Sequence, residues 1–151
     1  MSTSVRHSYP DIFNGIDLSG AKILIVEDDK GAGNTLMLLL QRFGAVPLLT
    51  RSVSEALVAI HTQIFDVILL DFQMPRLTGF NFMEILRLHP DPAVSNTFVI
   101  AITTQVDDKD RILASGCNMY FSKPTNPPEF LKSLTKVIEE LKNGAIANRV
   151  I

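Results

Sequence analysis

Short, uninterrupted apolar runs recur along the chain at residues 23–26, 67–70 and 98–102, with shorter runs at 46–49 and 119–121. They lie in candidate strands at residues 22–26, 46–49, 66–70, 98–102 and 119–122. Runs of this length and composition are typical of strands that are covered on both faces of a parallel sheet. Pro47 lies in the second run and lacks the amide hydrogen that an inner strand needs. The pattern therefore predicts five strands, with residues 46–49 at an edge of the sheet.

Between these runs, apolar residues recur at helical spacing. The spacing predicts helices at 30–43, 52–60, 79–88, about 107–115 and 127–141. Pro90 and Pro92 favour a loop after the third helix. Strands that alternate with helices imply an α/β fold with a doubly wound parallel sheet. We expect one domain over residues 21–142, after an N-terminal extension (1–20) with little structure of its own and before a C-terminal tail (143–151).

Polar side chains follow four of the five predicted strands. Glu27, Asp28 and Asp29 follow the first, Asp71 the third, Thr103 and Thr104 the fourth, and Lys123 the fifth. The carboxyl ends of parallel strands meet at one edge of a sheet, where open α/β sheets bind ligands. Carboxylates that converge there repel one another unless a cation lies among them. Oxygen ligands of this kind suit Mg²⁺.

Composition narrows the function classes. The chain has 151 residues, a formal net charge of −2 and no basic cluster, which gives no electrostatic reason to expect contact with nucleic acid or an anionic membrane. The single cysteine, Cys117, fits a reducing compartment. His7, His61 and His89 lack the spacing of metal ligands and are expected at the surface or at helix ends. No apolar segment reaches the length of a membrane span and no secretion signal begins the chain, so we expect a cytoplasmic protein.

Four motifs occur in order at the predicted strand ends and together are specific. They are Ile23 to Val26 followed by Glu27-Asp28-Asp29; Asp71-Phe72-Gln73-Met74-Pro75 with Gly79; Ile102-Thr103-Thr104; and Tyr120-Phe121-Ser122-Lys123-Pro124. In this combination, over about residues 22–141, the chain resembles the receiver domain of bacterial two-component response regulators, the family that includes the chemotaxis regulator. The resemblance implies a flavodoxin-like (βα)5 fold with strand order 2-1-3-4-5.

The resemblance also assigns roles to individual residues. Asp71 matches the phosphoacceptor, Lys123 matches the lysine that pairs with it and then with a phosphoryl oxygen, and Thr103 matches the hydroxyl that donates to the phosphoryl group. The family's ligands to Mg²⁺, with Mn²⁺ as an alternative, match Glu27, Asp28, Asp71 and the backbone carbonyl of Gln73. The Lys123–Pro124 bond matches a family position that is cis, although cis is the minority form of such bonds in general.

The same resemblance implies a conformational switch that changes a binding surface. Phosphorylation would draw Thr103 inward, and Tyr120, at the family's aromatic switch position, would turn into the vacated space. The alternative for Tyr120 is a half-buried ring with its hydroxyl in water. The change would reach the surface formed by the fourth helix, the last strand and the last helix. Expected partners are a sensor histidine kinase or histidine phosphotransfer protein and a downstream protein on that surface, with a homodimer as an alternative and no direct contact with nucleic acid or membrane.

Rival functions fit the residues less well. Gly31 and Gly33 hint at a dinucleotide-binding loop, but Leu36 replaces the third glycine and the carboxylates at 27–29 would face the pyrophosphate. A metal-dependent phosphatase of the haloacid dehalogenase type needs a second aspartate two residues after its nucleophile, where this chain has Gln73. We therefore expect no turnover of external substrates. A degenerate receiver that only binds partners is disfavoured because all the key positions are present.

Several features of the sequence leave finer questions open. Thr104 is bulkier than the residue that often follows the conserved hydroxyl, and Gln73 and Gln105 occupy positions that tune phosphate loss in the family. About ten residues follow the last predicted helix, which is too few for an output module. Residues 17–22 resemble the linker before receivers in hybrid kinases. A stand-alone receiver and one excised from a hybrid sensor kinase both remain alternatives.

Overall fold

The computed structural model describes residues 11–76, 78–104 and 106–144, which form a five-stranded parallel sheet in the order β2-β1-β3-β4-β5. The strands are β1 (Lys22–Val26), β2 (Val46–Thr50), β3 (Val67–Leu70), β4 (Phe98–Thr103) and β5 (Met119–Ser122). The helices are α2 (Lys30–Arg42), α3 (Val53–Thr62), α4 (Gly79–Arg87), α5 (Pro92–Ser95), α6 (Lys109–Ala114) and α7 (Pro127–Lys142), with 3₁₀ turns η1 (Asp11–Phe13) and η2 (Val106–Asp108). The predicted fold class and strand order are confirmed.

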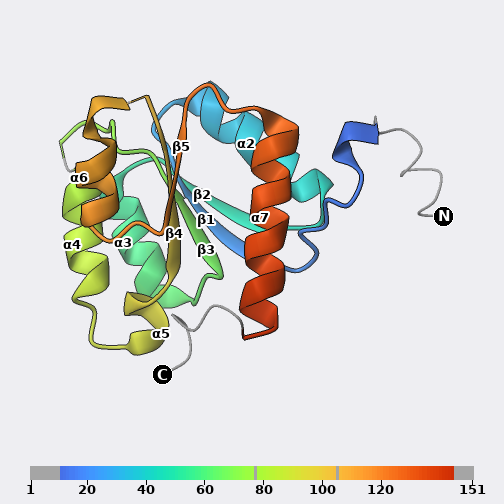
Figure 1. The fold of residues 1–151 in the computed structure, drawn as a ribbon. Helices are drawn as coiled ribbons and strands as arrows, with labels where there is room; N and C mark the ends of the chain where they lie inside the picture. Colours follow the sequence, from blue (N-terminus) through green and yellow to red (C-terminus); the bar gives the residue numbers. More distant parts are fainter. Residues whose placement is uncertain (1–10, 77, 105, 145–151) are drawn as a thin grey trace.

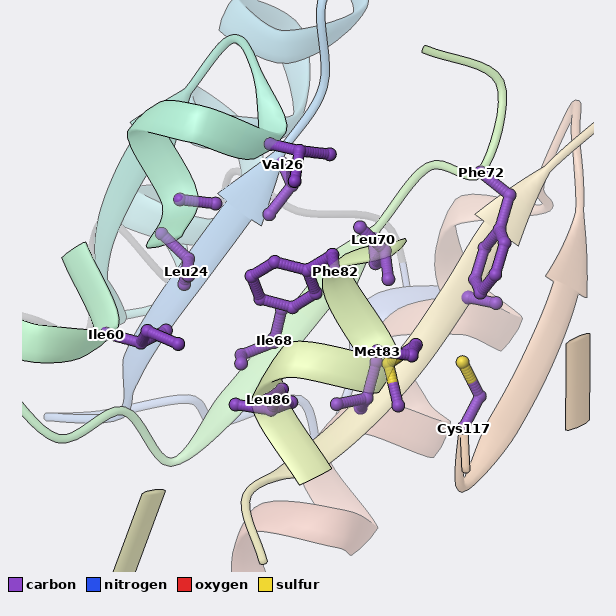
Figure 2. Close-up of a cluster of buried hydrophobic side chains, with 14 of the residues drawn as sticks. Leu24, Val26, Ile60, Ile68, Leu70, Phe72, Phe82, Met83, Leu86 and Cys117 are labelled. Atoms are coloured by element: carbon purple, nitrogen blue, oxygen red, sulfur yellow. The ribbon is translucent and has the colours of Figure 1, made fainter. Parts of the chain in front are cut away.

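Helices cover both faces of the sheet: α2 and α7 lie on one side, and α3, α4 and α6 lie on the other (Figure 1). Because side chains alternate along a strand, each strand contributes to two cores. Leu24, Ile68 and Leu70 pack with Phe82 and Met83 of α4 (Figure 2). The intervening strand residues pack against α2 and α7. Burial on both faces explains why the strands read as continuous apolar runs.

The outer edge of β2 is poor in hydrogen-bond donors. The amide of Val46 donates to the carbonyl of Ala21 (2.7 Å), and the carbonyl of Thr50 accepts from Glu27 (3.0 Å). Residues 46, 48 and 50 therefore turn their backbone groups toward β1, and Pro47 and Leu49 turn theirs outward. Since proline has no amide hydrogen, Leu49 supplies the one outward donor within this strand. The predicted edge position of this strand is confirmed.

The segment after α4 differs from the loop that the sequence analysis predicts. Residues Pro92–Ser95 form the short helix α5. The side chain of Asp91 caps it by accepting from the amide of Ala93 (3.0 Å), and Pro92 occupies the first helical position. Proline is compatible with that position because the first amides of a helix have no partner inside the helix. Pro92 therefore begins a helix here, and the prediction of a loop is wrong.

Residues 11–20 pack onto the body of the domain. Leu18 is fully buried, and its amide donates to the carbonyl of Phe43 at the end of α2 (2.9 Å). The amide of Asp17 donates to the hydroxyl of Thr135 on α7 (3.2 Å), and the Phe13 ring stacks on Phe43 with centroids 5.8 Å apart. These contacts go beyond the expected extension with little structure. Residues 1–10 and 145–151 lie outside the described part, and the predicted division at residues 20 and 142 stays a prediction.

The guanidinium of Arg87, at the end of α4, joins three segments. It donates to the carbonyls of Ser95 (2.7 Å) and Thr97 (2.8 Å), which precede β4. It also donates to the carbonyl of Gly116 (2.6 Å) and to Oδ1 of Asn118 (3.1 Å), which precede β5. Burial lowers the pKa of this guanidinium. Among the described residues, no helix has the length and apolar character needed to cross a bilayer.

Candidate functional site

The predicted site residues lie where backbone pairing continues just past the strands. The amide of Asp71 donates to the carbonyl of Val26 (3.1 Å), and the amide of Lys123 donates to the carbonyl of Thr103 (3.0 Å). The amide of Glu27 is held by β2 in the same way. Backbone hydrogen bonds that continue the sheet therefore hold Glu27, Asp71 and Lys123 at its carboxyl edge.

Three carboxylates converge at this edge. Glu27, Asp28 and Asp71 each offer an oxygen, and these oxygens lie within 4.8 Å of one another. Asp71 and Glu27 are buried, with 7% and 5% of their surface exposed, whereas Asp28 is exposed. The donor set consists of oxygen alone and is open to solvent on one side, which fits a hard cation such as Mg²⁺ that keeps several waters. The residues present therefore fit the metal predicted from the sequence.

Lys123 links two of these carboxylates. Its ammonium nitrogen Nζ lies 2.5 Å from Oε1 of Glu27 and 3.1 Å from Oδ2 of Asp71. Burial raises the pKa of Glu27 and the charge of Asp71 adds to the increase, while the hydrogen bond from Lys123 partly offsets both. Burial opposes the charge on Lys123, but the hydrogen bond to Glu27 and the two carboxylate charges raise its pKa. Three carboxylates face one ammonium, so negative charge remains in excess.

The hydroxyl residues after β4 differ in exposure. Thr103 is fully buried beside the site, and Thr104 is exposed. The hydroxyl of Thr104 contacts the side-chain oxygen of Gln73, and the amide of Gln73 donates to Oδ1 of Asp71 (2.9 Å). Thr104 and Gln73 therefore pair across the mouth of the site. Gln105 lies outside the described residues, and the role of the Gln73 carbonyl as a metal ligand stays a prediction.

Tyr120 lies on β5, and its ring is half-buried. Its ring centroid is 5.6 Å from the ammonium of Lys109 on α6, which is a cation–π contact. Tyr120 also packs against the core that α4 and α6 cover. The residue predicted as a switch thus touches both the core and α6. The Lys123–Pro124 peptide bond that follows β5 is cis, as the resemblance implies.

The loop after Asp71 explains the glycine that follows it in the motif. The Phe72 ring lies so close to Gly79 that a Cβ at position 79 would come within 2.7 Å of it. Phe72 also meets Phe80 edge to face, with centroids 4.8 Å apart. The absence of a side chain at Gly79 lets α4 begin directly over Phe72. This contact fixes the backbone immediately after Asp71.

Two features had no signal in the sequence. A cavity of about 570 Å³ opens beside Asp71, between α2 and α7, and apolar side chains form most of its wall. On the far side of the domain, the rings of His61 and His89 lie with centroids 5.0 Å apart. Their separation along the chain hides this proximity, so sequence spacing could not reveal it. Their expected places at helix ends agree with the structure; His7 lies outside the described residues.

Comparison with known proteins decides the family. The family model for the response regulator receiver domain matches residues 23–135, which is well over half of the chain. The chain belongs to this family. It is a receiver domain of a two-component system, and the acidic cluster described above is where receiver domains bind Mg²⁺.

Curated relatives of this receiver domain are moderately similar. It is 35% identical over 123 residues to the probable transcriptional regulator ycf29 of Cyanophora paradoxa, covering 80% of this chain and 56% of that protein. It is 32% identical over 114 residues to the polar-differentiation response regulator DivK of Brucella ovis, covering 74% of this chain and 91% of DivK. The receiver domain thus spans little more than half of the first relative and most of the second.

A solved structure with the same fold adds chemical detail for that protein. The receiver domain of sensor histidine kinase PA1611 from Pseudomonas aeruginosa has a TM-score of 0.73 and 26% identity, and the match covers 80% of this chain and 99% of that one. Its structure has a magnesium ion coordinated in the active site cleft. Receiver domains of both response regulators and histidine kinases therefore resemble this chain.

Proposed function

We propose that Asp71 accepts a phosphoryl group from a phosphohistidine of a sensor histidine kinase or a histidine phosphotransfer protein. One observation carries the proposal: Lys123 pairs with Asp71 (3.1 Å) while oxygens of Glu27 and Asp28 lie within 4.8 Å of an Asp71 oxygen. Lys123 places a positive charge at the Asp71 carboxylate, and a metal cation held by Glu27, Asp28 and Asp71 would add a second. Such a carboxylate can approach an anionic phosphoryl group, because the repulsion between them is offset.

In this mechanism, an Asp71 oxygen forms a bond to phosphorus while the bond from phosphorus to the imidazole nitrogen breaks, and the imidazole leaves. The ammonium of Lys123 pairs with the Asp71 carboxylate before the transfer and with a phosphoryl oxygen after it. The hydroxyl of Thr103 donates to another phosphoryl oxygen. Bound Mg²⁺, held by Glu27, Asp28, Asp71 and the carbonyl of Gln73, would supply further neutralisation of charge.

The output is a change of surface rather than a released product. When Thr103 moves toward the phosphoryl group, it leaves space beside β5, and Tyr120 turns to fill it. Because Tyr120 touches Lys109, the change reaches α6, and it extends along β5 to α7. A downstream protein, or a second copy of the domain, would read the surface formed by α6, β5 and α7.

Steady turnover of external phosphoesters is not part of this function. Gln73 stands where a phosphatase with an aspartyl nucleophile needs a second carboxylate, and an amide cannot act as its acid and base.

We also propose a cytoplasmic location, where kinases deliver phosphoryl groups. The likeness to the receiver of PA1611 supports the alternative that this domain comes from a hybrid sensor kinase.

Intact mass spectrometry tests the proposal. Incubation with acetyl phosphate and Mg²⁺ should add one phosphate to the wild type and none to Asp71→Asn. A chelator should abolish the labelling of the wild type. Asp91→Asn is a matched control, because asparagine keeps the helix cap at α5 and the site is untouched. Labelling of Asp71→Asn to the wild-type level, or sustained release of p-nitrophenol from p-nitrophenyl phosphate, would refute it.

A further inference from the structure

Two histidines that are far apart in the sequence meet at the edge of the sheet opposite Asp71. His61 lies in the last turn of α3, which leads from the carboxyl end of β2 to the amino end of β3. His89 follows α4, which leads from β3 back toward the start of β4. The two ring centroids are 5.0 Å apart, and the ring planes are inclined by 54°. The pair therefore lies on a different part of the surface from the acidic cluster.

Backbone groups hold both rings by the same nitrogen. Nδ1 of His61 lies 2.6 Å from the carbonyl oxygen of Leu57. Because a carbonyl only accepts, Nδ1 carries the proton and Nε2 of His61 keeps its lone pair. Nδ1 of His89 accepts from the amide of Asp91 (3.0 Å). Within the residues that the structure describes, no hydrogen bond reaches Nε2 of either ring. A histidine that donates Nδ1–H to a carbonyl and leaves Nε2 open has the arrangement of a metal ligand.

The distance between the rings fits two ligands of one metal ion. Zinc binds a histidine nitrogen at about 2.0–2.1 Å with tetrahedral angles, which places the centroids of two ligating imidazoles about 5 Å apart. The observed separation of 5.0 Å agrees with that spacing. At this spacing, one ion can be ligated by both rings without a displacement of α3 or α4.

We propose that His61 and His89 bind Zn²⁺ through their Nε2 atoms. Imidazole nitrogen suits Zn²⁺, whereas the hard cation Mg²⁺ takes oxygen ligands. In the described part of the chain, no carboxylate or cysteine joins the two rings in a cluster of three ligands, so water completes the coordination. Half of the protein ligands of a structural zinc site implies a dissociation constant on the order of 1–100 μM.

Binding requires one rearrangement at His89. While Nδ1 accepts from the Asp91 amide, a neutral ring carries its proton on Nε2. When Zn²⁺ takes the Nε2 lone pair, this proton moves to Nδ1 by way of water, and the amide of the exposed Asp91 donates to water instead. His61 needs no such change. Zinc then ties the end of α3 to the segment after α4, and it stabilises the folded state because it binds that state.

Nuclear magnetic resonance of the histidine side-chain nitrogens tests the site. Titration of the ¹⁵N-labelled protein with ZnCl₂ in excess Mg²⁺ should shift Nε2 of His61 and Nε2 of His89 together, with the saturation of a single site. Mg²⁺ alone should leave both nitrogens unchanged. No shift at about 1 mM Zn²⁺, or a shift in one ring only, would overturn the proposal.

Substitution of each ligand separates the pair from zinc binding by histidines in general. His89→Asn removes the imidazole, and the asparagine oxygen can still accept from the Asp91 amide two residues on. His61→Gln places a good helix former at an exposed position. Each variant should weaken Zn²⁺ binding, followed at the remaining ring, by about tenfold or more. His7→Gln is the matched control and should keep the wild-type affinity. Equal weakening in all three variants, or wild-type affinity in either ligand variant, would overturn the proposal.

Stability gives a second measurement. At about ten times its dissociation constant, Zn²⁺ in excess Mg²⁺ should lower the unfolding equilibrium constant of the wild type about elevenfold, and His61→Gln should lose this gain. An equal gain in the two proteins, measured by urea denaturation, would overturn the proposal. Asp71→Asn should show the same zinc shifts at both histidines as the wild type, because the pair lies at the other edge of the sheet. The zinc site and the phosphoacceptor can therefore fail separately.

Discussion

Arg87 holds the ends of α4, α5 and α6 together through one planar group. Its hydrogen bonds end on carbonyls that come before β4 and β5, so it fixes where both strands enter the sheet. No local pattern predicts this role, because the partners are far away along the chain and a charged residue at the end of a helix usually faces solvent. Asp71 and Lys123, by contrast, are predictable, since each directly follows an apolar run.

Arg87→Met should lower the free energy of unfolding by about 2 to 4 kcal/mol, because several carbonyls lose a charged donor. The free energy of unfolding of Arg87→Lys should lie between those of Arg87→Met and the wild type. The reason is that an ammonium cannot reach both strand entries in the way that the planar guanidinium does. Urea denaturation followed by circular dichroism measures both. A loss below about 0.5 kcal/mol in Arg87→Met would show that the bonds contribute little.

Cys117 should be unreactive in the folded protein. It is 7% exposed, and burial raises the pKa of its thiol to about 11, with Ser115 and Arg87 opposing the increase. At pH 8 only about one thiol in a thousand is then ionised, and the thiolate is the reactive form. Ellman's reagent should react slowly with the native protein. In urea it should react at once with one thiol per molecule. The native rate should increase with pH up to about 11. Immediate reaction of the folded protein would contradict this expectation.

At the scale of elements, the strands were the easiest to predict and the connections the hardest. Continuous apolar runs identify buried strands, and the helical spacing around residues 36–43 and 130–141 identifies α2 and α7. Pro90 and Pro92 led to the prediction of a loop at α5, because proline is common at the start of both helices and turns. The segment at residues 11–20 looked unstructured because its order comes from α2 and α7 and not from its own sequence.

Leu18→Ala should lower the free energy of unfolding by about 2 to 5 kcal/mol, as expected for a fully buried leucine. Leu18 has no exposed surface and packs in the core that α2 and α7 cover. Ile12→Ala is the matched control in the same segment, because Ile12 is 56% exposed. The control should change stability by less than about 0.5 kcal/mol. Urea denaturation measures both variants. If Leu18→Ala changed the free energy of unfolding as little as Ile12→Ala does, the segment would not belong to the cooperative unit.

At the scale of the molecule, alternation within each strand decides which core a side chain joins. The parallel direction of the strands, which the alternation of strands and helices predicts, brings the carboxyl ends of all five strands to one edge. The strand order came from the family resemblance, because several orders satisfy the same pattern of apolar runs. The cavity between α2 and α7 was beyond prediction, since it depends on how two helices separated by most of the chain approach each other.

Magnesium should stabilise the whole domain, because it binds carboxylates that repel one another in the folded state. At a concentration of about 100 times its dissociation constant, Mg²⁺ should add about 2.7 kcal/mol to the free energy of unfolding. Asp28→Asn should raise stability in a chelator, since it removes one of the clustered charges, and should reduce the gain from Mg²⁺. Thermal unfolding with and without the metal measures both effects. An undiminished gain in Asp28→Asn would exclude Asp28 as a ligand.

The outer border of β2 affects how separate molecules behave when they are crowded. A neighbouring chain that tried to extend the sheet there would meet a gap at Pro47, where a donor is missing, and could form only an interrupted ladder. Fibre growth by strand addition is thereby discouraged even though Val46 and Leu48 are exposed beside it. Pro47 thus lowers the tendency of the protein to aggregate by strand addition at high concentration.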